Sequence, residues 1–301
     1  MTSWIENRVL RGALLATGLV FSQFSAAVIV PLAIESSSTP QGGRIYVPTQ
    51  MAGFESLMRL DTGATTSRIR LASWNKNLPI VDHSESVSAS GQTRSCDMVQ
   101  SQGIALRTTN SGKVMRSNYV LSRCPDESSE DLFGLDFFIG TQVRFDFNAR
   151  TIELNEPAPT ATQFLPLKII TTGDPLLALP LKVDSNTSYF GMVDSGAEIS
   201  AVDERYVHYH ENQFEFIKDV AEASDAAGKS WTPKLYRMKE LAIAGGKTLK
   251  DVLVIVYDFG YVRQALGTET PFILGYNVLS QFNWTFDLKN IDRARYSVEN
   301  R

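Results

Sequence analysis

Two stretches of the chain, LMRLDTGATTS at residues 57–67 and FGMVDSGAEIS at residues 190–200, share nearly the same pattern. In each stretch, mostly apolar residues lead to an aspartate, which is followed by a hydroxyl residue, a glycine and an alanine. The apolar run predicts a buried strand, and the glycine permits a sharp turn after it. One such turn is common in β proteins. Two copies in matched contexts predict a pair of equivalent, rigidly held aspartates, Asp61 and Asp194.

The two stretches belong to a longer internal repeat. VPLAI from Val30 matches LPLKI from Leu165, SASGQT from Ser88 matches DAAGKS from Asp225, and LFGLDFFIGTQVRFDF from Leu132 matches ILGYNVLSQFNWTFDL from Ile273. All of these matches occur in the same order along the chain. We therefore expect a duplicated chain, with halves at residues 28–155 and 163–301. Prolines and small residues at 156–162 indicate the linker.

Strand and turn patterns dominate both halves. Runs rich in β-branched and aromatic residues, such as RIYVPTQ at residues 44–50 and DVLVIVYDF at residues 251–259, are bounded by turn-forming residues. Helical pattern is confined to short pieces after Gly134, after Gly275 and around residues 203–216. The expected fold is mainly β, with two similar β-barrel-like lobes related by a pseudo-twofold axis and few short helices.

The composition indicates a folded globular protein, since 43% of the 301 residues are apolar and 21% are charged. The net charge of −4, without a long basic run, makes nucleic acid an unexpected partner. His208 and His210 have the spacing of metal ligands, but no carboxylate or cysteine pattern completes a site. We therefore expect neither a metal nor another cofactor.

The N-terminus has the pattern of an export signal. Arg8 and Arg11 precede an uncharged stretch at residues 12–34, within which small residues around Ala27 suit cleavage. Residues 1–27 are predicted to be a signal peptide, because the repeat assigns the residues after them to a strand. An uncleaved segment reaching Ile34 would instead anchor the chain in a membrane. The expected location is periplasmic or secreted.

The only two cysteines are Cys96 and Cys124, both in the first half. In an exported protein such a pair can form a disulfide. Pairing requires their Cα atoms to lie within about 7 Å of each other. Two unpaired thiols in a β-rich half are the alternative.

The paired aspartates suggest a reaction. If the halves are related by a twofold axis, Asp61 and Asp194 lie side by side at that axis. Two adjacent carboxyl groups share one proton, so that one member acts as a base and the other as an acid. The base can take a proton from water while the acid hydrogen-bonds the carbonyl oxygen of the substrate. This arrangement predicts hydrolysis by water without a covalent intermediate.

These motifs resemble those of the aspartic proteases, and their details are closer to the retropepsin-like branch than to classical pepsins. The resemblance spans nearly the whole chain after residue 27. It implies an aspartic endopeptidase with the acid-protease fold, acting on protein or peptide. It also implies that the residues after the aspartates form and lock the two loops: Thr62, Gly63, Ser195 and Gly196. Behind these loops, the resemblance places the LFG and ILG segments, followed by Asp136 and Asn277.

The same resemblance places two hairpin flaps over the substrate, around Gly91 and Gly228. Neither segment has the flap tyrosine of classical pepsins, and two ordinary surface hairpins are the alternative. Because one chain supplies both aspartates, we expect a monomer. A protein that binds peptides on the same bilobal scaffold without cutting them is the alternative function.

Overall fold

The computed structural model describes residues 28–87, 93–125, 130–155, 163–171, 175–182, 188–220, 223–224 and 230–301. Within these residues the protein is mainly β, with few short helices, as the sequence predicts. The predicted signal peptide and linker lie outside the described residues. No helix in the described part is both long and apolar enough to cross a membrane.

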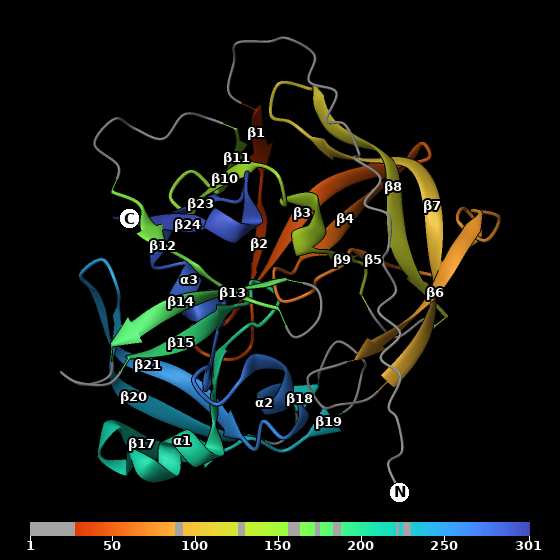
Figure 1. The fold of residues 1–301 in the computed structure, drawn as a ribbon. Helices are drawn as coiled ribbons and strands as arrows, with labels where there is room; N and C mark the ends of the chain where they lie inside the picture. The colour runs from red at the N-terminus through yellow and green to blue at the C-terminus, as the bar shows by residue number, and fades with distance from the viewer. Residues whose placement is uncertain are drawn as a thin grey trace, which may run out of the picture.

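The first half forms an eight-stranded sheet, drawn in orange to olive in Figure 1. Across the sheet its strands are β2 (Ala33–Ser36), β3 (Gly43–Met51), β4 (Phe54–Leu60), β9 (Leu132–Phe133), β5 (Arg68–Arg70), β8 (Lys113–Cys124), β7 (Thr93–Arg107) and β6 (Ile80–Val87). A further pairing of β3 with β7 closes six of these strands into a barrel.

The second half forms another eight-stranded sheet with the same order of pairing. Its strands are β13 (Lys168–Ile170), β14 (Leu176–Lys182), β15 (Ser188–Val193), β22 (Phe272–Leu274), β16 (Ser200–Asp203), β21 (Lys247–Tyr257), β20 (Lys234–Ile243) and β17 (Phe214–Asp219). Here β14 pairs with β20 and closes the barrel. In both sheets the strand that ends before the aspartate, β4 or β15, runs parallel to its short neighbour, β9 or β22.

A six-stranded sheet takes strands from both halves. Its order is β1 (Val28–Pro31), β11 (Thr151–Leu154), β10 (Gln142–Asp146), β23 (Phe282–Asp287), β24 (Arg295–Asn300) and β12 (Leu165–Pro166). The antiparallel pairing of β10 with β23 joins the two halves at its centre. The first residues of the repeat segments VPLAI and LPLKI, Val30 and Leu165, thus lie in strands at its opposite edges. A separate two-stranded sheet contains β18 (Ala223–Ser224) and β19 (Ser230–Trp231).

The helices are short. They are α1 (Glu204–Tyr209), α2 (Tyr261–Leu266) and α3 (Tyr276–Leu279), together with the 3-10 turns η1 (Leu135–Phe137), η2 (Glu211–Gln213) and η3 (Ile291–Arg293). Four of the six lie where the sequence pattern predicts helix: η1 after Gly134, α3 after Gly275, and α1 and η2 within residues 203–216. The sequence analysis did not predict α2, which is held by the burial of Val262 and Leu266 rather than by a side-chain cap.

Alternating burial explains why these segments are strands. Along β3 every second residue is buried, from Gly43 to Met51, so that one face of the strand lines the barrel interior. One continuous apolar core includes Ile45 of the first barrel, Leu181 of the second and Trp284 of the shared sheet. The two barrels are therefore packed into one body, which fixes how the loops at the ends of β4 and β15 face each other.

Candidate active site

Each predicted aspartate directly follows the strand that delivers it. The Asp61 N–H donates to the carbonyl oxygen of Phe133 at 3.0 Å, and the Asp194 N–H donates to that of Leu274 at 3.0 Å. The acceptors are the last residues of β9 and β22. Each aspartate therefore directly follows the end of a pair of parallel strands inside a barrel, where the backbone has little conformational freedom.

The two aspartates are brought together, each against the glycine of the other loop. A Cβ atom on Gly196 would lie 2.4 Å from the carboxyl carbon of Asp61, and one on Gly63 would lie 2.7 Å from that of Asp194. Side-chain atoms cannot approach so closely, so only glycine fits at either position. The carboxyl groups of Asp61 and Asp194 also hydrogen-bond each other.

Backbone amides orient both carboxyl groups. Asp61 Oδ1 accepts hydrogen bonds from the N–H groups of Gly63 and Ala64, both at 3.0 Å. Asp194 Oδ1 accepts from Gly196 at 2.9 Å and from Ala197 at 3.1 Å. The two loops thus hold their carboxyl groups in the same way, with one oxygen of each bound to the backbone.

The electrostatics of the pair favour one shared proton. Burial, the negative charge of Asp61 and the hydrogen bond that protonated Asp194 donates to Asp61 raise the pKa of Asp194 to about 8. The Gly196 N–H and the positive charge of Arg59 act in the opposite direction. A carboxyl group with this pKa keeps its proton at neutral pH. The pair can then offer one acid and one base at the same point.

Two hydroxyl groups lock the loops together. Thr62 Oγ1 donates to the carbonyl oxygen of Val193 at 2.9 Å and accepts from the Ser195 N–H at 3.0 Å. Reciprocally, Ser195 Oγ donates to the carbonyl oxygen of Leu60 at 3.0 Å and accepts from the Thr62 N–H at 3.1 Å. Both side chains are buried. The four bonds join loops more than 130 residues apart in the chain.

Behind the first loop, Ser67 is bound to Asp136. The Ser67 N–H and hydroxyl both donate to Asp136 Oδ1, at 3.0 and 2.8 Å, and Ser67 Oγ accepts from the Gly134 N–H at 2.9 Å. Burial raises the pKa of the Asp136 carboxyl, although hydrogen bonds from Tyr119 and Ser67 oppose that effect. A Cβ on Gly134 would lie 2.8 Å from the Ser67 nitrogen, so glycine is needed at this crossing.

The second loop has the same support with an amide in place of the acid. The Ser200 N–H and hydroxyl donate to Asn277 Oδ1, both at 2.8 Å, and the Gly275 N–H donates to Ser200 Oγ at 2.9 Å. The Asn277 amide donates in turn to the carbonyl oxygen of Leu253 at 2.8 Å. The serine that ends each quoted motif is thus a structural part of the site, which the sequence analysis did not recognise.

A group of charged residues beside the loops was also missed. Arg59 Nη1 donates to Glu130 at 2.8 Å, and Arg59 Nη2 donates to the carbonyl oxygen of Gly196 at 2.6 Å. Arg44 binds Glu198 at 2.5 Å, and the Tyr46 hydroxyl donates to Glu130 at 3.1 Å. The one sequence signal for this charged group is the arginine inside the apolar run LMRLD. A charged side chain in the interior of a strand requires a partner of opposite charge or a hydrogen-bond acceptor.

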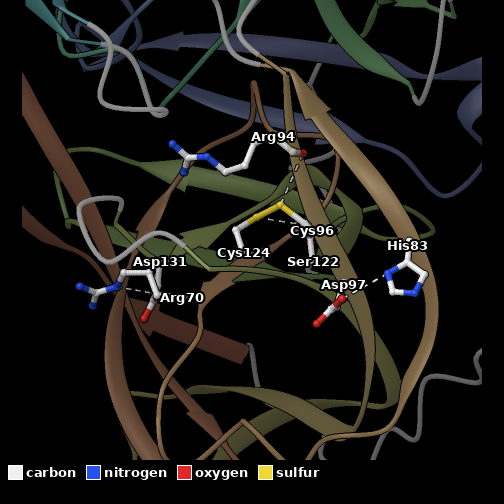
Figure 2. Close-up of a disulfide and its surroundings, with 8 residues drawn as sticks. All are labelled: Arg70, His83, Arg94, Cys96, Asp97, Ser122, Cys124 and Asp131. Atoms are coloured by element: carbon white, nitrogen blue, oxygen red, sulfur yellow. Dashed lines mark hydrogen bonds and ion pairs between the residues drawn. A yellow bond between two sulfur atoms is a disulfide. The ribbon is translucent and has the colours of Figure 1, made fainter.

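The structure joins the two cysteines. Cys96 and Cys124 form a disulfide between β7 and β8, with their Cα atoms 4.5 Å apart. Figure 2 shows the bond, with Asp97 beside it facing His83 on β6. A disulfide is typical of proteins exported to an oxidising compartment.

Residues 28–31 and 33–36, which include the end of the predicted anchor segment, are strands β1 and β2. The predicted flap glycines, Gly91 and Gly228, lie outside the described residues.

By fold, the chain is similar to many solved structures, of which two are described here. No family model matches it, and no curated protein matches its sequence. Soybean basic 7S globulin superposes with a TM-score of 0.54 and 12% identity, over 91% of this chain and 95% of that chain. The structure of edgp superposes with a TM-score of 0.57 and 10% identity, over 91% of this chain and 94% of that chain.

These comparisons correct the family resemblance drawn from the motifs. The motifs led to an assignment to the pepsin-like and retropepsin-like aspartic proteases, but two of the similar structures are named as a basic 7S globulin and as edgp. The assignment is therefore wrong. The motif is weak evidence for a family, because an aspartate, a hydroxyl residue and a glycine at the end of a parallel strand pair meet a need of the local backbone. At 10–12% identity the likeness shows the fold alone.

Proposed function

We propose that this protein hydrolyses peptide bonds as an aspartic-type endopeptidase, using a water activated between Asp61 and Asp194. The observation that carries the proposal is the placement of each carboxyl group against the glycine of the opposite loop. In that position the two groups hydrogen-bond each other, and burial together with the Asp61 charge raises the pKa of Asp194. Two carboxyl groups that share a proton can act as acid and base in one reaction.

The proposed reaction needs no cofactor. The ionised carboxylate takes a proton from water, and the water oxygen forms a bond to the carbonyl carbon of the peptide. The protonated carboxyl donates to the carbonyl oxygen, which becomes the hydroxyl of a tetrahedral intermediate. A proton then passes to the peptide nitrogen, the carbon–nitrogen bond breaks, and an acid and an amine leave. The backbone amides and the hydroxyl lock keep both carboxyl groups in place during these steps.

We further propose that the two barrels are lobes related by a pseudo-twofold axis through the aspartates. In support, both eight-stranded sheets have the same order of pairing, and both loops repeat the same hydrogen bonds. Because one chain supplies both aspartates, the active unit is a monomer, and its activity per molecule should not fall on dilution. The disulfide supports export, and we propose a periplasmic or secreted location, free or held by the N-terminal segment.

A second candidate is a protein that binds peptides on this scaffold without cutting them. It is favoured by the names of the two similar structures, a globulin and edgp, neither of which is the name of a peptidase. Both aspartates and both glycines are present here, and a protein that only binds would not need their mutual contact. The first candidate therefore explains more of the geometry.

The experiment separates the two candidates. The purified protein is incubated with a denatured protein mixture, with and without pepstatin, beside Asp61→Asn, Asp194→Asn and the exposed control Asp292→Asn. We expect the parent and the control to cleave and both dyad variants to be inactive. Activity should also fall as the pH rises above neutral, where the pair loses the proton that it shares. Cleavage that survives either dyad substitution contradicts the proposal, and saturable peptide binding without cleavage supports the second candidate.

A further inference from the structure

Arg59 reaches from the strand of one aspartate to the loop of the other. It lies on β4, two residues before Asp61, between Met58 and Leu60, which are fully buried. Its side chain is only 16% exposed. Nη2 donates to the carbonyl oxygen of Gly196 at 2.6 Å, a contact between residues 137 apart in the chain. A short, charge-assisted hydrogen bond to a backbone carbonyl is among the stronger contacts that a side chain makes.

Gly196, like Gly63 in the other loop, contacts both carboxyl groups. Its N–H donates to Asp194 Oδ1 at 2.9 Å, and its α-carbon faces the carboxyl group of Asp61. A rotation of this glycine would change the hydrogen bond to Asp194 and the space available to Asp61 together. By holding the Gly196 carbonyl oxygen, Arg59 limits that rotation.

Arg59 is itself fixed by acidic neighbours. Nη1 donates to Glu130 at 2.8 Å, and Nη2 lies 3.8 Å from Glu198. Glu198 also binds Arg44 at 2.5 Å, and Glu130 accepts from Tyr46 at 3.1 Å. Two arginines and two glutamates form this group, so its formal charge balances. The planar guanidinium can bind a carboxylate with one nitrogen and a carbonyl with another, which a lysine cannot do.

Among the residues of the second half that the structure describes, no side chain makes an equivalent contact. The residue two positions before Asp194 is Met192, which is buried in an apolar cluster with Ile273 and Val262. The two loops therefore share the glycine turns and the hydroxyl lock, but they differ in this charged support. Together with the exchange of Asp136 for Asn277 behind the loops, this difference makes the two aspartates unequal.

We propose that Arg59 is a positioning residue of the aspartate pair, which fixes the Gly196 turn and so holds the carboxyl groups of Asp61 and Asp194 at contact. The inference rests on the proposed function only in calling that pair catalytic. Arg59 does not touch the reacting atoms. Its role is to set the geometry of the pair and, through its charge, the pH at which the pair holds its proton.

The direction of the charge effect follows from the groups around Asp194. Asp61 and burial raise the pKa of Asp194, and Arg59 lowers it. The other charged groups beside this loop are Glu198 on the loop itself, Glu130 before β9 and Arg44 on β3. Loss of Arg59 leaves less positive charge to offset the negative charges of the acidic groups. The pKa of Asp194 must then rise, because the ionised form loses a positive charge that stabilises it.

The test does not depend on activity. In full-length protein labelled with ¹³C-aspartate, the Asp194 carboxyl is titrated by NMR in an Asp61→Asn background, where coupling to the second aspartate is absent. Adding Arg59→Met should raise the pKa of Asp194 by about 1. Arg59→Gln, which keeps a polar donor and disturbs the fold less, should raise it in the same direction. Arg107→Met is the matched control, because Arg107 pairs with Glu55 on the same strand β4 at an exposed position.

Kinetics form the second arm, with Asp61 intact. Arg59→Met and Arg59→Lys should both lower kcat by about tenfold or more with little change in KM, since a displaced carboxyl group impairs the chemical step. Arg59→Lys should leave the pKa of Asp194 nearer the parent value, because the charge remains. An unchanged titration in Arg59→Met and Arg59→Gln, or parent kcat in Arg59→Lys, overturns the role of Arg59. A parent without peptidase activity overturns the proposed function instead, while the titration still decides the inference.

Discussion

Removing the Thr62 hydroxyl tests how strongly the two loops hold each other. Thr62→Val keeps the shape of the side chain but deletes the atom that donates to the Val193 carbonyl and accepts from the Ser195 N–H. Thr62 is 3% exposed and Ser195 is 4% exposed, so water cannot easily replace the lost partner. One buried N–H and one buried carbonyl oxygen are left without this hydroxyl.

The expected cost follows from those two groups. A buried polar group that loses its partner costs about 1–3 kcal/mol, and a carbonyl oxygen with a second acceptor site is at the low end of that range. We therefore expect Thr62→Val to lower the free energy of unfolding by about 2–4 kcal/mol. That is a large part of the roughly 5–15 kcal/mol typical of a folded protein, yet the variant should still fold without denaturant.

Urea denaturation of the parent, Thr62→Val, Ser195→Ala and the double variant measures the effect. Thr248→Val is the matched control, because Thr248 is exposed on β21. Since each hydroxyl binds the backbone N–H of the other residue, the two substitutions should be non-additive by at least about 0.5 kcal/mol. If Thr62→Val costs no more than Thr248→Val, or if the two losses simply add, the loops do not depend on each other as described.

Three more predictions concern the pair and its surroundings. The free energy of unfolding should decline as the pH rises from about 4 to about 8, because folded Asp194 keeps a proton that the unfolded carboxyl, with its pKa of 3.8, has already lost. Asp194→Asn should weaken this decline in thermal unfolding across that range, and an equal slope in both proteins would contradict the raised pKa. Gly196→Ala should reduce peptidase activity by about a hundredfold or more, because the new Cβ would lie 2.4 Å from the Asp61 carboxyl carbon. The control Gly112→Ala, in an exposed turn, should retain activity. Equal activity of the two variants would refute the close approach of Gly196 to Asp61. Replacing both Cys96 and Cys124 by serine opens a link across 28 residues. It should lower the free energy of unfolding, measured by urea denaturation, by about 3–4 kcal/mol. An unchanged urea midpoint would argue against a stabilising bond.

Local patterns account for the parts of the fold that the sequence predicted. The alternating burial along β3 and the apolar runs before each aspartate depend on neighbours in the chain, so they can be recognised without a structure. The same holds for the short helical pieces that follow Gly134 and Gly275. Helix α2 escaped prediction because it is only one and a half turns long and is held by tertiary burial of Val262 and Leu266.

By itself, the sequence determined a mainly β chain in which Asp61 and Asp194 follow matching apolar runs and precede matching glycine turns. It determined this because strand periodicity and glycine turns are encoded within about ten neighbouring residues. Only the tertiary structure decided that each carboxyl group lies against the glycine of the other loop, that Cys96 and Cys124 pair, and that Arg59 holds the carbonyl oxygen of Gly196. The last of these contacts joins residues 137 apart. Such distances are set by the packing of two barrels on one shared sheet, and no local pattern in the chain specifies them.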